Sequence, residues 1–97
     1  MERQPAVYIL TNKLNGTLYT GVTSNLQGRI WQHKNKMTKG LSAKYNLTML
    51  VYYELYGDIC GAISREKQIK AGPRKAKVRL VEAANPEWRD LYAEICR

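Results

Sequence analysis

Cysteines and long apolar segments are both scarce in this sequence, and each shortage narrows the class of protein. Only Cys60 and Cys96 occur among 97 residues, and their spacing is not that of a metal site. Each lies among helix-forming residues, so we expect both to be small core residues. The alternative is a disulfide between them, which is rare in cytosolic chains. No apolar run approaches the roughly 20 residues of a membrane-spanning helix, and none long enough for a signal peptide follows residues 1–5. We therefore expect a cytoplasmic protein with no membrane partner.

Acidic residues are also few, at 8 Asp and Glu against 16 Lys and Arg, which gives a net charge of +8. Such an excess favours polyanionic partners, nucleic acid before an anionic membrane. A basic surface that only keeps the protein in solution would give the same count, so charge alone does not decide. The length predicts one small domain over residues 1–97, whose core is large enough that folding need not depend on disulfides or metal. No small-molecule cofactor is expected.

Two segments rich in β-forming residues predict a hairpin. Residues 7–12 are apolar on both faces, which indicates a central strand that is covered on both sides. Asn15-Gly16 is the strongest hairpin signal in the sequence, because both residues tolerate positive φ. Residues 18–23 form the returning strand.

The hairpin places two tyrosines on one face of the sheet. Directly opposed residues share a face and side chains alternate along each strand, so Tyr8 and Tyr19 point to the same side. A two-residue turn would leave them four positions apart, whereas a wider loop that closes at Asn12 and Thr17 would bring them nearer. The sequence leaves both registers open.

The remaining signals complete an α/β (α+β) fold, in which a small, three-stranded, largely antiparallel sheet is flanked by helices. Leu26 and Ile30 face inward on the first helix. Capping residues, Gly and Pro mark the boundaries. The expected elements are a helix from Ser24 or Asn25 to about Lys36, a strand over 47–55, a helix from Asp58 through Lys70, another helix after Gly72-Pro73, and a last helix that begins at Asn85-Pro86-Glu87.

Two residues suited to phosphodiester chemistry lie on the first expected helix. Arg29 and His33 are four residues apart and therefore share a helix face. An arginine there can hold a phosphate through two parallel hydrogen bonds, and hydrolysis also needs a group that helps to deprotonate water. The alternatives are a solvated charge for Arg29 and a surface or half-buried side chain for His33.

Glu66 lies on the apolar stripe of the second expected helix, between Ala62 or Ile63 and Ile69. A carboxylate directed at a core is unfavourable unless it is paired or bound to metal. It could ligate a hard cation such as Mg²⁺. The alternatives are an ion pair with Arg29 or a position at the edge of the stripe.

The order of these residues resembles a known family. Ala6-Val7-Tyr8 and Tyr19-Thr20-Gly21 resemble the paired signature of the GIY-YIG nuclease domain, and Arg29, His33 and Glu66 follow at close to the family's spacing. The resemblance covers nearly the whole chain. It is closest to stand-alone domains that look like the N-terminal nuclease domain found in excinuclease.

The resemblance implies roles for these residues. Tyr8 would be the general base toward water, with His33 holding or accepting its proton, and Tyr19 would orient the water or phosphate. Glu66 would ligate the metal, Mg²⁺ or Mn²⁺. In the excinuclease branch the second tyrosine is favoured as the base, helped by a lysine three residues later. Here that position is Val22, which favours Tyr8.

Three further features bear on function. Asn85 matches a late asparagine of the stand-alone relatives, although a helix cap explains it equally well. Trp31 could stack on a base, with packing as its alternative, and Trp88 is expected in the core. The predicted phosphate-binding residues, whose alternative is a set of solvated helix faces, are Lys34, Lys67, Lys70, Arg74, Lys75 and Lys77.

Together these observations predict a metal-dependent endonuclease or nickase that acts on DNA, in repair or processing. The alternative is a nucleic-acid-binding module with little or no catalysis. We expect Tyr8, Tyr19, Arg29 and Glu66 to converge on one side of the sheet. The oligomeric state is left open by the sequence.

Overall fold

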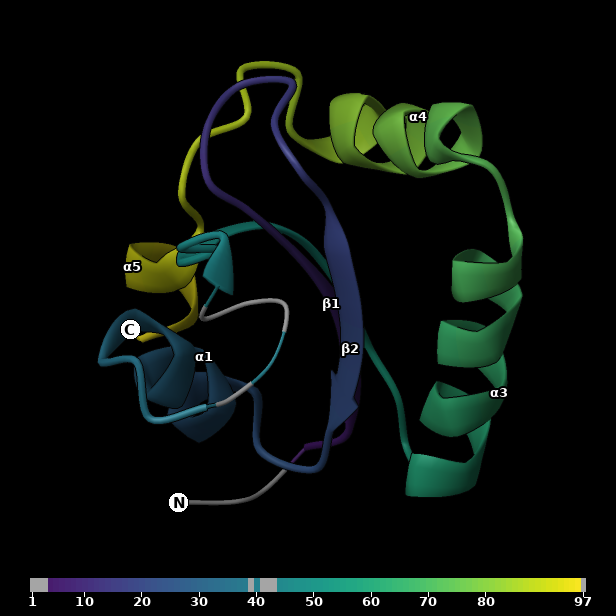
Figure 1. Cartoon of the computed structure of the whole chain (residues 1–97). Helices are drawn as coiled ribbons and strands as arrows, with labels where there is room; N and C mark the ends of the chain where they lie inside the picture. The colour runs from purple at the N-terminus through teal and green to yellow at the C-terminus, as the bar shows by residue number, and fades with distance from the viewer. Residues whose placement is uncertain (1–3, 39, 41–43, 97) are drawn as a thin grey trace.

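A computed structural model describes residues 4–38, 40 and 44–96. Two strands come first, then a helix, a third strand and three helices, and Figure 1 labels all of these elements except the third strand. The elements are β1 (Ala6–Thr11), β2 (Tyr19–Thr23), α1 (Leu26–Lys34), β3 (Met49–Leu55), α3 (Ile59–Ala71), α4 (Arg74–Ala84) and α5 (Tyr92–Ile95).

The three strands form one sheet in the order β2-β1-β3, and both neighbouring pairs are antiparallel. β1 is the central strand, and all six of its residues are buried. This confirms the predicted fold class and the expectation of a first strand that is covered on both faces.

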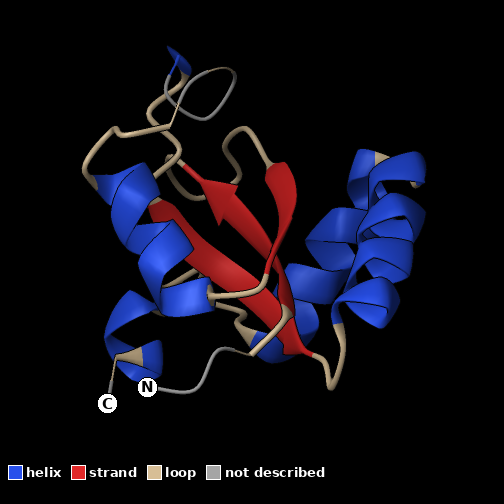
Figure 2. Ribbon diagram, turned by 90° about the horizontal axis from the view of Figure 1, so that it is seen from below, coloured by secondary structure: helices blue, strands red, loops and turns tan. Residues whose placement is uncertain are grey.

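Helices cover the two faces of the sheet separately. α1 and α5 lie on one face, and α3 and α4 lie on the other (Figures 1 and 2). Side chains alternate along β1, so the strand contributes to both layers of the core. Tyr8 and Leu10 pack with the α1 side, whereas Val7 and Ile9 pack with the α3 side. Trp88 is 2% exposed in the second layer, so its predicted place in the core is confirmed.

The hairpin adopts the wider of the two expected registers. Tyr8 lies opposite Gly21, and Leu10 lies opposite Tyr19. A two-residue type I′ turn needs positive φ at both central residues, but of the pair only Asn15 has it, at 57°. The turn is closed instead by Gly16, whose N–H donates to the Lys13 carbonyl at 2.9 Å. Both tyrosines nevertheless share the α1 face, as predicted.

α1 begins as predicted. The Asn25 side chain accepts a hydrogen bond from the Gly28 N–H at 3.2 Å and so caps the helix. Leu26 and Ile30 are buried beneath it, which confirms their inward orientation. In the same way the Asp58 carboxylate caps α3 through the Gly61 N–H at 2.8 Å.

Two expectations about the fold are wrong. The last helix does not begin at Asn85: this residue ends α4, and α5 starts only at Tyr92. Trp88 has φ of 56°, which an α-helix cannot contain. Cys60 and Cys96 are exposed rather than in the core, because Cys60 lies on the solvent side of α3 and Cys96 just beyond α5. Among the described residues, no helix has the length and apolar character to cross a membrane.

Candidate active site

Tyr8 is the more buried of the two tyrosines. Its side chain is 1% exposed, and its ring lies 6.4 Å from that of Tyr19, centroid to centroid. The Tyr8 hydroxyl lies directly over Gly21, since a Cβ added there would be 2.4 Å from both Cζ and Oη of Tyr8. Position 21 must therefore lack a side chain for the phenol to occupy this place.

His33, on α1, forms a hydrogen bond with the Tyr8 hydroxyl. Tyr8 Oη and His33 Nε2 are 3.0 Å apart, and the imidazole is 3% exposed. Its other nitrogen, Nδ1, lies 3.3 Å from Thr38 Oγ1. The imidazole also packs against Tyr19, with ring centroids 5.8 Å apart. α1 thus brings an imidazole to both tyrosines.

Electrostatics fixes the protonation of this pair. Burial, together with the nearby charge of Arg29, lowers the pKa of His33 from 6.5 to about 4. Burial raises the pKa of Tyr8 from 10.0 to about 12, while a hydrogen bond and the charge of Arg29 oppose the rise and the charges of Tyr19 and Glu66 add to it. Near neutral pH the phenol therefore keeps its proton and donates it to the neutral Nε2.

Arg29 lines a polar hollow next to this pair. The hollow has a volume of about 370 Å³ and is lined by Val22, Thr23, Asn25, Gly28, Arg29 and Gln32. Arg29 Nη1 donates to Gln32 Oε1 at 3.1 Å, which orients the guanidinium. Arg29 as a residue is half-buried and its guanidinium is accessible in a polar hollow, a setting suited to a phosphate group.

Glu66 reaches the tyrosines from the opposite layer. Its neighbours Ala62 and Ile69 on α3 pack against the face of the sheet that the tyrosines do not share. Glu66 is 8% exposed, and its charge contributes to the raised pKa of Tyr8. The expectation that all four residues lie on one side of the sheet is therefore wrong for Glu66. β2 is an edge strand of the sheet, and the contact between the two layers there is made by Lys70 of α3 with the ring of Tyr19.

Lys70 is the partner of Glu66, in place of the Arg29 that the sequence suggested. Lys70 Nζ lies 2.7 Å from Glu66 Oε2 and 5.8 Å from the centroid of the Tyr19 ring. Lys70 was predicted to bind phosphate, and its place beside Tyr19 was not predicted. Its spacing of four residues from Glu66 was the available signal.

A divalent cation fits this carboxylate. Within the described part of the chain, no three or more His, Cys, Asp or Glu side chains form a ready metal cage. Mg²⁺ does not require one, because it keeps several waters and binds through one or two carboxylates plus substrate phosphates. The nearly buried Glu66, whose charge acts on the Tyr8 phenol, matches such a one-carboxylate site.

Asn85 has a structural environment. Its side chain donates to the carbonyls of Val51 at 3.1 Å and Arg89 at 2.8 Å, and accepts from the Arg89 N–H at 3.0 Å. These bonds fasten the segment after α4 to β3. They favour the structural alternative for Asn85, as a residue that ends α4 rather than begins a helix.

The predicted phosphate-binding residues divide into two groups. Lys67, Lys70, Arg74 and Lys75 are exposed along α3 and the start of α4. Arg74 also donates to the Asn15 carbonyl at 2.9 Å, which joins α4 to the hairpin loop.

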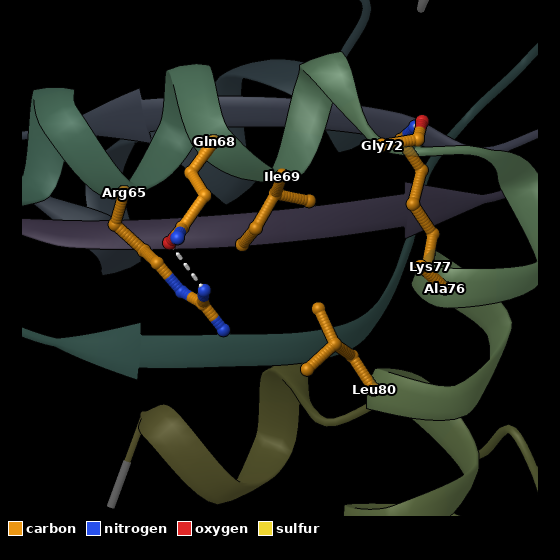
Figure 3. Close-up of a pocket in the computed structure, with 7 residues that line it drawn as sticks. All are labelled: Arg65, Gln68, Ile69, Gly72, Ala76, Lys77 and Leu80. Carbon is orange, nitrogen blue, oxygen red and sulfur yellow. Dashed lines mark hydrogen bonds between the residues drawn. The ribbon is translucent and has the colours of Figure 1, made fainter.

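Lys34 and Lys77 are engaged within the fold. Lys34 forms an ion pair with Asp90 and donates to the Thr48 carbonyl at 2.9 Å. Lys77 donates to the Gly72 carbonyl at 2.6 Å, beside a hollow of about 260 Å³ between α3 and α4 (Figure 3). These contacts give both lysines structural roles.

The family model of the GIY-YIG catalytic domain matches residues 4–79. This chain belongs to the GIY-YIG nuclease superfamily. Its relatives are UPF0213 proteins, which are stand-alone GIY-YIG domain proteins. No solved structure matches the chain.

Three such relatives illustrate the similarity. One from Staphylococcus haemolyticus is 39% identical over 80 residues, which cover 78% of this chain and 92% of that protein. One from Photorhabdus laumondii is 41% identical over 81 residues, covering 82% and 76%. One from Clostridium perfringens is 38% identical over 93 residues, covering 92% and 95%. Membership implies a nucleic-acid substrate, and GIY-YIG nucleases generally use divalent metals.

Proposed function

We propose that this protein is a divalent-metal-dependent endonuclease or nickase that hydrolyses DNA phosphodiester bonds, with Mg²⁺ or Mn²⁺ as the ion and DNA repair or processing as its setting. The observation that carries the proposal is the contact of 3.0 Å between the Tyr8 hydroxyl and a buried His33 imidazole, beside Arg29 and Glu66. A purely binding surface has no need of such a pair in its interior.

Tyr8 acts as the base by passing on its own proton. A phenol with a pKa of about 12 is protonated near neutral pH, so it accepts a proton from water only as its own proton leaves. His33 Nε2 lies where that proton would go. The attacking water therefore loses a proton to Tyr8 Oη while the phenolic proton moves to the imidazole.

Arg29 couples this transfer to the substrate. Its charge contributes to the low pKa of His33, about 4, at which the imidazole is a weak proton acceptor. A phosphate held by Arg29 brings negative charge that offsets the guanidinium and raises the pKa of His33. The relay is then most favourable when the phosphate is in place. Arg29 also stabilises the charge that grows on the phosphate in the transition state.

Glu66 would hold the metal ion, and a bound ion would supply charge neutralisation at the phosphate and at the leaving oxygen. Lys70 pairs with Glu66 Oε2 and so neutralises the carboxylate in the free protein. Its ammonium also supplies a cation beside Tyr19 that Val22 cannot provide. Tyr19 orients the water or phosphate.

The alternative function, a nucleic-acid-binding module with little or no catalysis, draws on the exposed Lys67, Arg74 and Lys75. Incubation of the protein with single-stranded, duplex, nicked and branched DNA, with and without Mg²⁺ or Mn²⁺, separates the two. We expect metal-dependent cutting that Glu66→Gln abolishes while DNA binding is retained. Glu87→Gln is the matched control, because this side chain is 79% exposed and its loss removes the same charge. Wild-type protein that binds every DNA and cuts none would establish the binding module instead.

A further inference from the structure

Trp31 is an exposed aromatic on the wall of a second hollow. Its side chain is 49% exposed, whereas Trp88, the other tryptophan, is 2% exposed. The hollow has a volume of about 310 Å³ and is lined by Asn25, Gln27, Gly28, Trp31 and Tyr92. Its lining comes from the cap and first turns of α1 and from Tyr92 of α5, and Figure 1 shows these two helices on the same side of the sheet.

The second hollow adjoins the hollow of Arg29. Asn25 and Gly28 line both. The Asn25 side chain is fixed there, because it caps α1 through the Gly28 N–H. A Cβ added at Gly28 would be 2.6 Å from Asn25 Nδ2, so a side chain at this position would disturb the wall that the hollows share. A ligand that places a phosphate at Arg29 thus has an aromatic-lined hollow beside it.

The chemistry of the lining suits a nucleobase. The indole of Trp31 and the ring of Tyr92 offer apolar surface for stacking. The side-chain amides of Asn25 and Gln27 can both donate and accept hydrogen bonds, as base edges require. Lys34 Nζ lies 5.2 Å from the centroid of the Tyr92 ring, which adds positive charge at the rim.

We propose that this hollow receives one unpaired nucleobase of the substrate strand, stacked on Trp31, next to the phosphate that Arg29 holds. The inference rests on the proposed nuclease function and names its substrate class. A base paired and stacked within a duplex is not free to enter such a hollow. The protein therefore selects DNA with an unpaired nucleotide beside the cut, such as a single strand, a flap or a bulge.

Tryptophan fluorescence tests this directly, because only one of the two indoles is exposed. The full chain is titrated without divalent metal, so that nothing is cut, with a short single-stranded oligonucleotide and with a duplex of the same length. We expect the single strand to quench the fluorescence and the duplex to quench it much less. Trp31→Ala should weaken single-strand binding by about 10- to 100-fold and leave duplex binding within about twofold. Trp31→Phe should restore most of the loss.

Lys75→Ala is the comparison variant, since an exposed lysine that meets phosphates should weaken binding of both DNA forms alike. Trp31→Ala that binds single strands as the wild type does, or that weakens both forms equally, would overturn the proposal; circular dichroism verifies folding. The nuclease proposal is judged separately by metal-dependent cutting. If single strands quench the fluorescence selectively but no DNA is cut, the base site is supported and the nuclease proposal fails. If DNA is cut but Trp31→Ala changes neither binding nor cutting, the nuclease proposal is supported and the base site fails.

Discussion

Mild acid should destabilise this protein through its only histidine. The ordinary pKa of 6.5 applies to His33 in the unfolded chain, and burial beside Arg29 lowers it to about 4 in the folded protein. Between these values the unfolded state binds the proton more strongly, so stability is fully present above the unfolded pKa and is lost as the pH falls toward the folded one. The linkage gives a loss of about 2 kcal/mol at about pH 5 and about 3 kcal/mol once both states are protonated.

Denaturant unfolding at a series of pH values measures this loss. Burial raises the pKa of Glu54, but its hydrogen bonds to Arg65, Tyr52 and Tyr56 together outweigh burial and lower that pKa from 4.5. Glu54 therefore loses its contribution to stability only below that value. The window between 4.5 and 6.5 therefore isolates His33. His33→Gln should show a nearly flat stability there. If the variant retains the slope of the wild type, the buried neutral imidazole and the relay built on it are wrong.

Three further predictions concern the site residues and the affinity for DNA. Arg29→Ala should slow single-turnover cutting by about 10²–10³-fold with the fold retained. Tyr8→Phe should slow cutting at least as much, and Tyr19→Phe should slow it less. The reverse order of the two tyrosine variants would exchange the roles of the tyrosines. Gly21→Ala forces a Cβ within 2.4 Å of the Tyr8 hydroxyl. It should lower stability by about 1–3 kcal/mol and slow cutting by more than about tenfold. Gly57→Ala should change neither, because a Cβ there would meet no atom within 4 Å. Affinity for DNA should fall steeply with salt because bound lysines and arginines release counterions, and an affinity that is flat from low to moderate salt would exclude nucleic acid as the partner.

The fold followed from the sequence where one local signal was sufficient. The two-sided apolar pattern of β1 predicted a central strand, and strand alternation placed Tyr8 and Tyr19 on one face whatever the turn. The register was not predictable, because it depends on whether Gly16 adopts positive φ together with Asn15. The course of the chain after Asn85 was missed for a similar reason: the buried packing of Trp88 overrides a standard helix-start signal.

The sequence predicted which residues lie near Tyr8, and it predicted less well from which layer each of them comes. A helical stripe shows which side of a helix faces the core, but not which face of the sheet the helix covers. The position of Glu66 on the stripe therefore predicted its burial and not its arrival from the opposite layer. The ion pair of Glu66 with Lys70 has a sequence signal, their spacing, whereas the approach of Lys70 to Tyr19 depends on tertiary packing.

The two layers of the candidate site meet at the edge strand β2. Tyr8 and Tyr19 belong to one layer and Glu66 and Lys70 to the other, and they meet only because β2 has no neighbour on its outer side among the described strands. A further strand paired with β2 would separate the ammonium of Lys70 from the ring of Tyr19 and close the approach to both phenols. An exposed edge is ordinarily a risk, since it can pair with another chain. Here two cationic side chains lie beside this edge and disfavour such pairing. Lys70 lies over the ring of Tyr19, and Arg74 donates to the carbonyl of Asn15 in the hairpin loop. The same unpaired edge that carries this risk is where Lys70 of α3 meets the ring of Tyr19.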